Sequence, residues 1–290
     1  MTNAELISAV RMQDRSDIFQ CVKEGFQLIG TPNFRATDVV AIKPNLCCIK
    51  GPETGATTDV RVVEGIIKYL QEEFQIHEIL VVESDGTQVL ADMAFKLLGY
   101  ERLSRRLNVK LINLSKTPCS TKTFLENASV KKVEYPNILE NVNWLVSVPK
   151  IKMHTLCSLG ATMKNQFGCN PFQKKSIYHK DLNTCIVDLN YIFKPQLIVV
   201  DGIVAMEGRG PVSGLPVAMN TLLFGRDAVA MDHFIARTIG MNPGAVKYLV
   251  EARKRGLGTA DYKTVGAGLE DVEKKFKGIP CRRNLYGMFS

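Results

Sequence analysis

Residues 39–82 read VVAIKPNLCCIKGPETGATTDVRVVEGIIKYLQEEFQIHEILVV, and the pattern within this stretch decides the fold. Residues 39–42 form a continuous apolar run, which is typical of a strand buried on both faces. Residues 59–74 carry apolar side chains at the spacing of an amphipathic helix, and residues 79–82 form a second apolar run. A strand, a helix and another strand in this order predict a right-handed βαβ unit with parallel strands.

The same alternation continues along the chain. Helical spacing recurs over residues 89–107, and strand-like apolar runs occupy residues 109–114 and 144–148, the last ended by Pro149. The second half adds predicted helices at 158–167, 176–191, 228–239 and 243–255, and predicted strands at 196–200 and 221–224. We therefore expect an α/β fold with a mostly parallel sheet, helices on both of its faces, and two lobes.

The organisation of the chain favours one body over independent domains. Its 290 residues correspond to one large or two ordinary globular units, and no repeat or long linker divides them. Residues 115–143 are more polar and contain Pro118 and Pro136, so we expect loops and short edge strands there. We predict a single α/β body over residues 1–290, with lobes at 1–114 and 144–290 joined by 115–143.

Composition excludes several classes of protein. With 46% hydrophobic and 23% charged residues, the chain is not disordered, collagen-like or coiled-coil. No apolar run approaches the ~18 residues that cross a bilayer, and residues 1–5 lack the pattern of a signal peptide. The eight cysteines are irregularly spaced, unlike a disulfide framework. We expect a cytoplasmic protein with reduced thiols and no membrane partner.

Positive charge is concentrated in one segment. The net charge is +8, and no acidic residue lies between Glu140 and Asp181. This segment contains Lys150, Lys152, Lys164, Lys174, Lys175 and Lys180. A nucleic-acid binder would show a recognisable reader motif or basic stripes with interleaved aromatics, and neither is found. The sequence therefore predicts a pocket for a small anionic molecule, with no nucleic-acid partner; the oligomeric state is not predicted.

The segment that follows the strand at 144–148 carries most of the candidate chemistry. It begins at the carboxyl end of a predicted strand, where parallel sheets bind their ligands. Lys152 and Lys164 supply charge, and Ser158 is expected to cap a helix whose free amides face an anion. His154 and His179 are each a candidate acid–base group or metal ligand, with a structural histidine as the alternative.

Polar side chains also follow other predicted strands. Lys43 and Asn45 come after the first strand and Asp85 after the second, so we expect them at the same rim of the sheet. A glycine-rich loop at residues 207–214, which includes Glu207, Gly208 and Gly210, is expected beside them. This loop does not match a nucleotide-binding glycine pattern, so it does not by itself predict a nucleotide.

A longer motif resembles a known family. The run Lys152-x-His154 is followed by Gly160-Ala161-Thr162-x-Lys164-Asn165-x-Phe167-Gly168-Cys169-x-Pro171. It resembles the signature of the domain of unknown function 362 family, whose members are often linked to iron–sulfur proteins. Further matches are Lys43-Pro44-Asn45-Leu46, Thr57-Thr58, Asp85-Gly86, the run from Asp201 to Pro211 with Gly214, Asp227 and Asp232. The resemblance covers most of the chain.

A more distant similarity is to the nickel-pincer lactate racemase. By position, His154 resembles a catalytic histidine, Lys164 the lysine that carries the pincer nucleotide, and His179 the nickel ligand. Arg61 stands where the racemase has a carboxylate-binding arginine. One position differs, because the racemase has Gly-Thr-His where this chain has Gly-Thr-Gln88. Glutamine cannot take a proton near pH 7, so this difference argues against racemisation.

Metal chemistry leaves alternatives open. The chain has no C-x₂-C-x₂-C-x₃-C run, so an iron–sulfur cluster would need cysteines that converge in space. Candidates for this are Cys47, Cys48, Cys157 and Cys169. A zinc or other divalent metal site would use His154, His179 and one cysteine, with His179 and Cys169 as the predicted metal ligands.

Together these patterns predict an enzyme that acts on a small carboxylate- or phosphate-bearing substrate. The predicted catalytic residues are His154, Lys164 and His179; the cofactor-binding residues are Lys43, Asn45, Lys152, Asn165, Gly208 and Gly210; the substrate-binding residues are Arg61, Asp85 and Glu207. The candidate cofactors are a nickel-pincer nucleotide, another divalent metal and an iron–sulfur cluster. The alternatives are a non-catalytic iron–sulfur or metal-binding redox partner and a ligand-binding protein without turnover.

Overall fold

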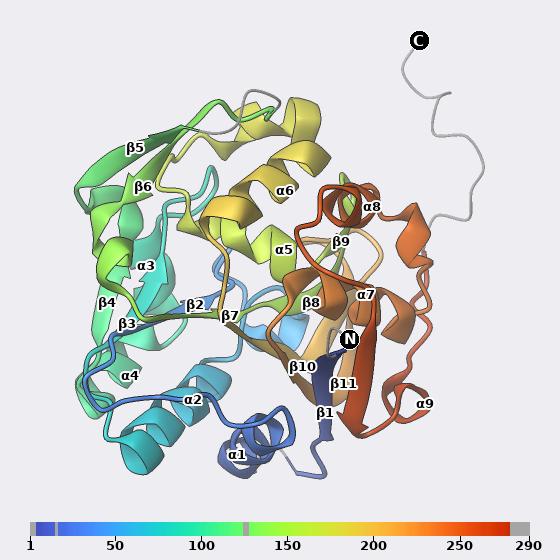
Figure 1. The fold of residues 1–290 in the computed structure, drawn as a ribbon, viewed down its shortest axis with the longest axis horizontal. Helices are drawn as coiled ribbons and strands as arrows, with labels where there is room; N and C mark the ends of the chain where they lie inside the picture. The colour runs from blue at the N-terminus through green and yellow to red at the C-terminus, as the bar shows by residue number, and fades with distance from the viewer. Residues whose placement is uncertain (1–3, 15–16, 124–127, 279–290) are drawn as a thin grey trace.

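The structure is a computed structural model that describes residues 4–14, 17–123 and 128–278. The strands of its main sheet are β1 Glu5–Arg11, β2 Val40–Pro44, β3 Ile79–Glu83, β4 Lys110–Asn113, β7 Trp144–Val148, β10 Leu197–Glu207, β11 Leu215–Gly225 and β12 Tyr262–Gly266. Their order across the sheet is β12-β1-β11-β10-β7-β2-β3-β4 (Figure 1). Residues 1–114 and 144–290 both contribute strands to this sheet.

One half of the sheet is parallel throughout. β2 pairs in parallel with β3 and β7, β3 with β4, and β7 with the start of β10. Every residue of β2 and β3 is buried, which explains why both read as uninterrupted apolar runs. In the other half, β11 is antiparallel to both β10 and β1. The predicted α/β fold with a mostly parallel sheet is confirmed.

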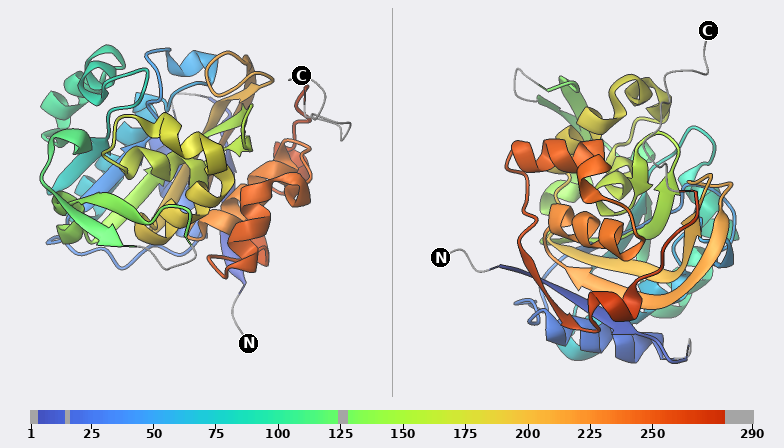
Figure 2. Two further views of the ribbon diagram at one scale, coloured as in Figure 1. Left: turned by 90° about the horizontal axis from the view of Figure 1, so that it is seen from above. Right: turned by 90° about the vertical axis from the view of Figure 1, so that its right-hand side faces the viewer.

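Helices cover both faces of the sheet (Figures 1 and 2). One face packs against α1 Ile18–Leu28, α2 Val60–Phe74, α3 Ala91–Leu97 and α4 Tyr100–Leu107. The opposite face packs against α5 Thr162–Asn165, α6 Leu182–Ile192, α7 Ala228–Thr238 and α8 Lys247–Lys254. Each face has its own apolar core, as expected for a sheet buried between two helical layers. Residues 115–143 add the antiparallel pair β5 Cys119–Thr123 and β6 Lys132–Pro136.

The sheet opens beside the end of β2. The chain leaves β7 through Pro149 and continues as β8 Lys150–His154, which stays paired with β10. β2 pairs with β7 and ends at Pro44, opposite Val148. β8, which continues from β7, therefore extends beyond the end of β2. The order in which the strands are added also reverses at β2: β3 and β4 lie on one side of it, and the later strand β7 lies on the other. Such a switch point leaves a crevice at the carboxyl ends of the strands.

The prediction of a helix over residues 158–167 is wrong. Ser158 has a left-handed φ of 68° and lies in a short strand, β9 Ser158–Gly160, which pairs antiparallel with β8. Only α5 and the following 3-10 turn η4 Gln166–Cys169 are helical. The first amides of α5, on Thr162 and Met163, donate to the Asp232 carboxylate at 2.7 and 3.1 Å. The anion expected at this helix N-terminus is therefore one of the protein's own side chains.

Other predicted elements differ mainly at their ends. The helix expected over residues 89–107 is divided into α3 and α4 by Gly99, whose φ is 86°. Residues 175–181 form the 3-10 segment η5 Lys175–Asp181, so α6 begins later than the helix expected at 176–191. The strand expected at 196–200 continues to Glu207, because β11 pairs with β10 along that length.

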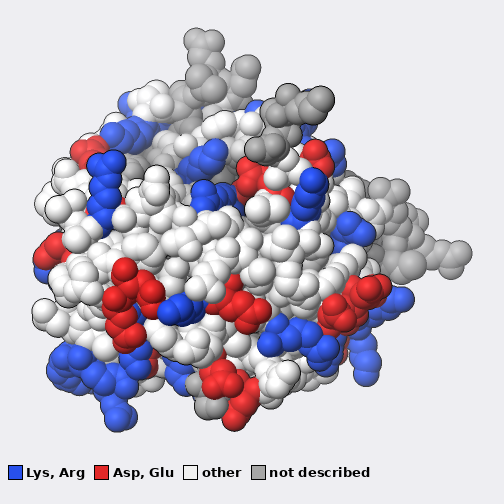
Figure 3. Space-filling view, turned by 60° about the horizontal axis from the view of Figure 1, so that its bottom comes forward, with Lys and Arg blue, Asp and Glu red and all other residues white. Residues whose placement is uncertain are grey.

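Two surface properties bear on partners. Among the described residues, no helix combines the length and the apolar composition needed to cross a membrane. Figure 3 shows a face on which basic and acidic side chains are interspersed, so the positive excess forms no continuous basic stripe on that face.

We predict that Asp232 is needed to hold α5 in place. The Asp232→Ala protein should lose about 2–4 kcal/mol of unfolding free energy, because the amides of Thr162 and Met163 and the Tyr248 hydroxyl lose their acceptor. Urea unfolding can be followed by the fluorescence of Trp144, the single tryptophan. Asp92→Ala, which removes an exposed carboxylate, should change stability by at most roughly 0.5 kcal/mol. Equal effects of the two substitutions would contradict this role.

Candidate functional site

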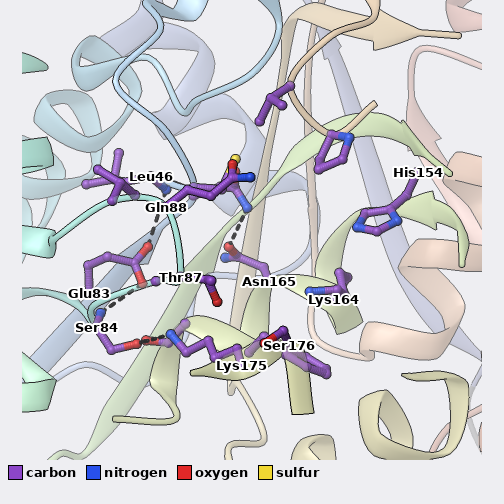
Figure 4. A pocket seen from close by; sticks show the side chains of 18 of the residues that line it. Leu46, Glu83, Ser84, Thr87, Gln88, His154, Lys164, Asn165, Lys175 and Ser176 are labelled. Carbon is purple, nitrogen blue, oxygen red and sulfur yellow. Dashed lines mark hydrogen bonds between the residues drawn. The ribbon is translucent and has the colours of Figure 1, made fainter. Parts of the chain in front are cut away.

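A cavity of about 460 Å³ lies at the carboxyl ends of β2 and β3, beside β8. Its walls include Lys43, Asn45, Cys47, Glu83, Gln88, His154, Lys164, Asn165 and Lys175 (Figure 4). These residues come from strand ends and from the segment of residues 154–176, far apart in sequence. A cavity thus lies in the crevice expected where the strand order reverses.

A buried ion pair forms the floor of the cavity. Lys43 is 1% exposed, and its Nζ lies 2.8 Å from Glu83 Oε2 and 2.5 Å from the Pro44 carbonyl oxygen. Gly168 covers this pair so closely that a Cβ atom there would lie 2.2 Å from Lys43 Cε and 2.3 Å from Glu83 Oε1. A residue with a side chain would displace the pair, which gives the glycine of the motif a steric reason.

Asn165 connects α5 to the strand ends. Its Nδ2 donates to the Lys43 carbonyl oxygen at 3.1 Å and to Ser147 Oγ at 3.0 Å. Its Oδ1 accepts from Asn45 Nδ2 at 3.2 Å. Both asparagines were predicted to bind a cofactor. Here they bond to the protein itself and to each other, and both line the cavity.

Two further amines face the cavity without a carboxylate partner among the described ion pairs. Lys164 Nζ lies 3.8 Å from the centroid of the Phe167 ring, and burial lowers the pKa of its ammonium. Lys175 Nζ donates to Ser84 Oγ at 2.5 Å, and burial lowers its pKa to about 8. Figure 4 shows both side chains directed into the hollow. The cavity therefore holds positive charge that a bound anion would stabilise.

His154 lies on the same side of the cavity as Lys164 (Figure 4). It is the last residue of β8, and its Nδ1 accepts a hydrogen bond from the Leu156 amide at 3.2 Å. That acceptor role places the proton of a neutral imidazole on Nε2, as assigned from the hydrogen bond. Two residues expected in one pocket, His154 and Lys164, thus line a single cavity.

Lys152 lies behind the cavity wall. Its Nζ donates to Asn45 Oδ1 and to the Ala56 carbonyl oxygen, each at 2.8 Å, and to Cys47 Sγ at 3.3 Å. Cys47 itself lines the cavity. A hydrogen bond from Cys48 and the charge of Lys152 lower the pKa of the Cys47 thiol to about 5, although burial opposes the shift.

Several predicted substrate-binding residues do not line this cavity. Asp85 accepts from the Ala91 amide at 2.8 Å and from Asn113 Nδ2 at 2.9 Å, so it caps α3. Arg61 pairs with Asp59 at 2.6 Å in a separate cavity of about 90 Å³. Glu207 accepts from the Lys277 amide at 2.7 Å.

The glycine-rich loop is the turn between β10 and β11. Gly208 adopts a left-handed φ of 77°, and a Cβ atom on Gly210 would lie 1.9 Å from the Met153 carbonyl oxygen. These glycines let the turn approach β8, and the next residues, Pro211 and Val212, line the cavity.

The predicted metal ligands are not assembled among the described side chains. Cys169 is fully buried, and burial raises the pKa of its thiol to about 12; the same holds for Cys157. His179 lies in η5, but its side chain is outside the part of the chain that the structure describes. Within that part, no three His, Cys, Asp or Glu side chains are grouped to hold a metal ion.

Sequence reasoning did not select Glu83 as a site residue. It named Cys47 only as a candidate ligand of an iron–sulfur cluster, and Lys175 only as one lysine of the basic segment. Glu83 is the last residue of β3. Asp85 was predicted because it follows this strand, but the carboxylate that lines the cavity lies two residues earlier, within the strand itself. Lys175 follows the motif by a few residues. Cys47 closely follows Lys43 and Asn45, but only the approach of Lys152 from β8 distinguishes it from a structural cysteine.

Two comparisons relate this chain to known proteins. A family model described as "Domain of unknown function (DUF362)" matches residues 40–237. A protein of Synechocystis sp. described as a "Thylakoid-associated protein" is 25% identical over 244 residues, which cover 79% of this chain and 71% of that protein. The family match includes every residue that lines the cavity.

We predict that Lys175 destabilises the protein in the absence of a ligand. At pH 7 the Lys175→Met protein should be more stable by roughly 1–3 kcal/mol, because burial disfavours the Lys175 ammonium. Between about pH 8 and pH 10 the unfolded chain binds the extra proton, so the wild-type protein gains stability as pH rises and the difference shrinks. Urea unfolding at several pH values measures this. Lys174→Met, at the exposed neighbour, should show neither effect, and a constant difference across pH would contradict the assignment.

Proposed function

This chain belongs to the DUF362 family, and from that premise we propose that its cavity binds a small carboxylate- or phosphate-bearing molecule and acts on it. The observation that carries the proposal is the pair of amines of Lys164 and Lys175, which face one cavity without a carboxylate partner among the described ion pairs. Both residues are half-buried, and two ammonium groups that face one cavity attract a group of opposite sign. A bound anion would supply it.

The charges in and around the cavity indicate the size of this anion. Lys43 is neutralised by Glu83, and Lys152 lies against Cys47. Lys164 and Lys175 remain, so a ligand with one or two negative charges balances the site. Because burial lowers the pKa of both amines, binding should raise their pKa again and take up protons.

His154 supports a catalytic role for this cavity. Its imidazole is half-buried at the wall that also holds Lys164, where it can donate or accept a proton on a bound ligand. Gln88 also lines the cavity, and by the sequence resemblance it stands in place of the racemase's second catalytic histidine. Because glutamine cannot take a proton near pH 7, the chemistry that we propose is acid–base catalysis by His154 and not racemisation.

The candidate cofactors differ in how well the described residues could hold them. Lys164 offers an amine with a lowered pKa inside a cavity of about 460 Å³, which suits a covalently attached organic cofactor. An iron–sulfur redox partner would need several cysteines close together, and within the described part of the chain no three Cys, His, Asp or Glu side chains are grouped in this way. Intact mass and elemental analysis of the native protein separate these two cases.

The cytoplasm is the compartment that we propose. Seven described cysteines are free thiols, a usage typical of reducing compartments. The description of the Synechocystis relative as thylakoid-associated concerns that protein.

Anion binding should depend on Lys164. We expect inorganic phosphate or pyruvate to raise the melting temperature of the wild-type protein more than chloride does at equal ionic strength. Lys164→Ala should weaken this binding at least tenfold, about 1.4 kcal/mol, whereas Lys174→Ala should not. Affinity should also fall as pH rises through about 8, where Lys175 loses its proton. Equal binding by Lys164→Ala and the wild-type protein would refute the proposal.

Turnover should depend on His154. Among small carboxylates and phosphate esters screened by NMR, any compound that the protein converts should still bind to His154→Gln, with conversion slowed by about 10²-fold or more. His77→Gln, at an exposed histidine outside the cavity, is the matched control. L-lactate should yield no D-lactate, and its appearance would show that the inference from Gln88 is wrong.

A further inference from the structure

Three lysines of β2 and β8 are almost fully buried, and their partners differ. Lys43, Lys150 and Lys152 are 1%, 1% and 2% exposed. Lys43 pairs with the Glu83 carboxylate at 2.8 Å, and Lys150 pairs with the Asp201 carboxylate at 3.1 Å. The acceptors of Lys152 are two neutral oxygens and the sulfur of Cys47. In its thiol form Cys47 can itself donate to the Ala56 carbonyl oxygen, which lies 3.6 Å from its Sγ.

These three acceptors complete the hydrogen bonding of a Lys152 ammonium. An ammonium has three N–H donors, and each has one acceptor here: Asn45 Oδ1 at 2.8 Å, the Ala56 carbonyl oxygen at 2.8 Å, and Cys47 Sγ at 3.3 Å. Amide oxygens do not ionise, so the thiol is the acceptor that can carry the balancing negative charge. A buried ammonium without such a charge is costly, and Cys47 therefore takes the place that Glu83 and Asp201 hold beside the other two lysines.

We propose that Cys47 is a nucleophile of the cavity, held as a thiolate by Lys152, and that it bonds to an electrophilic carbonyl carbon of the anionic ligand. This inference rests on the proposed function, since Lys164 and Lys175 would hold the anionic end of that ligand in the same cavity. The ligand class is a small aldehyde or keto compound that also carries a carboxylate or a phosphate.

The proposed step balances without an oxidant or reductant. A lone pair of Cys47 Sγ forms the C–S bond, and the π electron pair of the carbonyl moves to its oxygen. That oxygen takes a proton from the Lys152 ammonium, which leaves a neutral amine and a thiohemiacetal or thiohemiketal. The reverse step returns the proton and restores the thiolate–ammonium pair. The Cys48 thiol donates a hydrogen bond to Cys47.

The chemistry of Cys47 supports this step. The hydrogen bond from Cys48 and the nearby charge of Lys152 lower the pKa of Cys47, and they outweigh its burial and the charge of Glu83, which raise it. For Cys119, Cys157 and Cys169, burial is the largest cause and the pKa is raised. A thiolate is the reactive form of cysteine. Cys47 alone among the described cysteines lines the cavity and contacts a lysine ammonium.

Alkylation of the full-length reduced protein by neutral iodoacetamide at pH 6 tests the nucleophile. The rate at each cysteine is measured by peptide mass spectrometry, with Cys119 as the internal reference because it is not fully buried. We expect Cys47 to react about tenfold faster than Cys119, since its larger thiolate fraction outweighs its lower intrinsic nucleophilicity. If Cys47 reacts no faster than Cys119, the proposal is overturned.

Two variants test the role of Lys152. Lys152→Met should slow alkylation of Cys47 at pH 6 at least tenfold, with recovery as pH rises toward 9, whereas Lys116→Met at an exposed site should change nothing. A folded Lys152→Met protein whose Cys47 still reacts rapidly at pH 6 would overturn the pairing. Should Lys152→Met fail to fold, the wild-type comparison with Cys119 still decides.

Iodoacetate separates this inference from the proposed function. Because this reagent is an anion, Lys164 and Lys175 should raise its rate at Cys47, relative to iodoacetamide, several-fold above the same ratio at Cys119, and phosphate should protect Cys47. A ratio equal to that of Cys119 together with rapid reaction with iodoacetamide would support the nucleophile and refute anion binding. Slow reaction with both reagents, in a protein that binds phosphate, would refute the nucleophile alone.

Discussion

Charge compensation of buried lysines is the constraint on which the site depends. An ammonium removed from water destabilises a protein unless an acidic group and hydrogen-bond acceptors replace the solvent. Glu83 does this for Lys43, Asp201 supplies the opposite charge 3.1 Å from Lys150, and we infer that Cys47 supplies it for Lys152. Each pair joins separate strands or loops, so the charges also fix how the ends of the strands lie relative to one another.

The sheet topology explains why these charges meet. β2 ends at Pro44 while β8 continues along β10, and the hollow between them receives the residues that follow β2 and β3. Asn165 closes one side by bonding to the Lys43 carbonyl oxygen and to Ser147, and Gly168 permits α5 and η4 to approach the Lys43–Glu83 pair. The motif is therefore partly a packing motif, in which small and amide residues bring a helix onto buried charges.

Local pattern in the sequence predicted the parallel half of the fold well, because β2, β3 and β7 are buried on both faces and read as continuous apolar runs. It failed at residues 158–167, where pairing of β9 with β8 outweighs helical spacing and a distant carboxylate, Asp232, caps α5. Strand ends predicted Lys43 and Asn45 in the cavity but not Cys47, because its distinguishing neighbour, Lys152, lies 105 residues away. Long-range contacts of this kind leave no local pattern.

A Cys47 thiolate also determines which positive charges of the cavity remain unbalanced. With Glu83 and the thiolate paired, Lys164 and Lys175 are the described amines of the cavity whose charge the protein does not balance, and burial lowers the pKa of both. A protein with such a site is less stable without ligand than with it, because a bound anion would balance the charge of the two ammonium groups. The same anion would then rest beside a thiolate and an imidazole. Selection for stability alone would favour the replacement of both lysines, so their presence favours a role in binding a ligand.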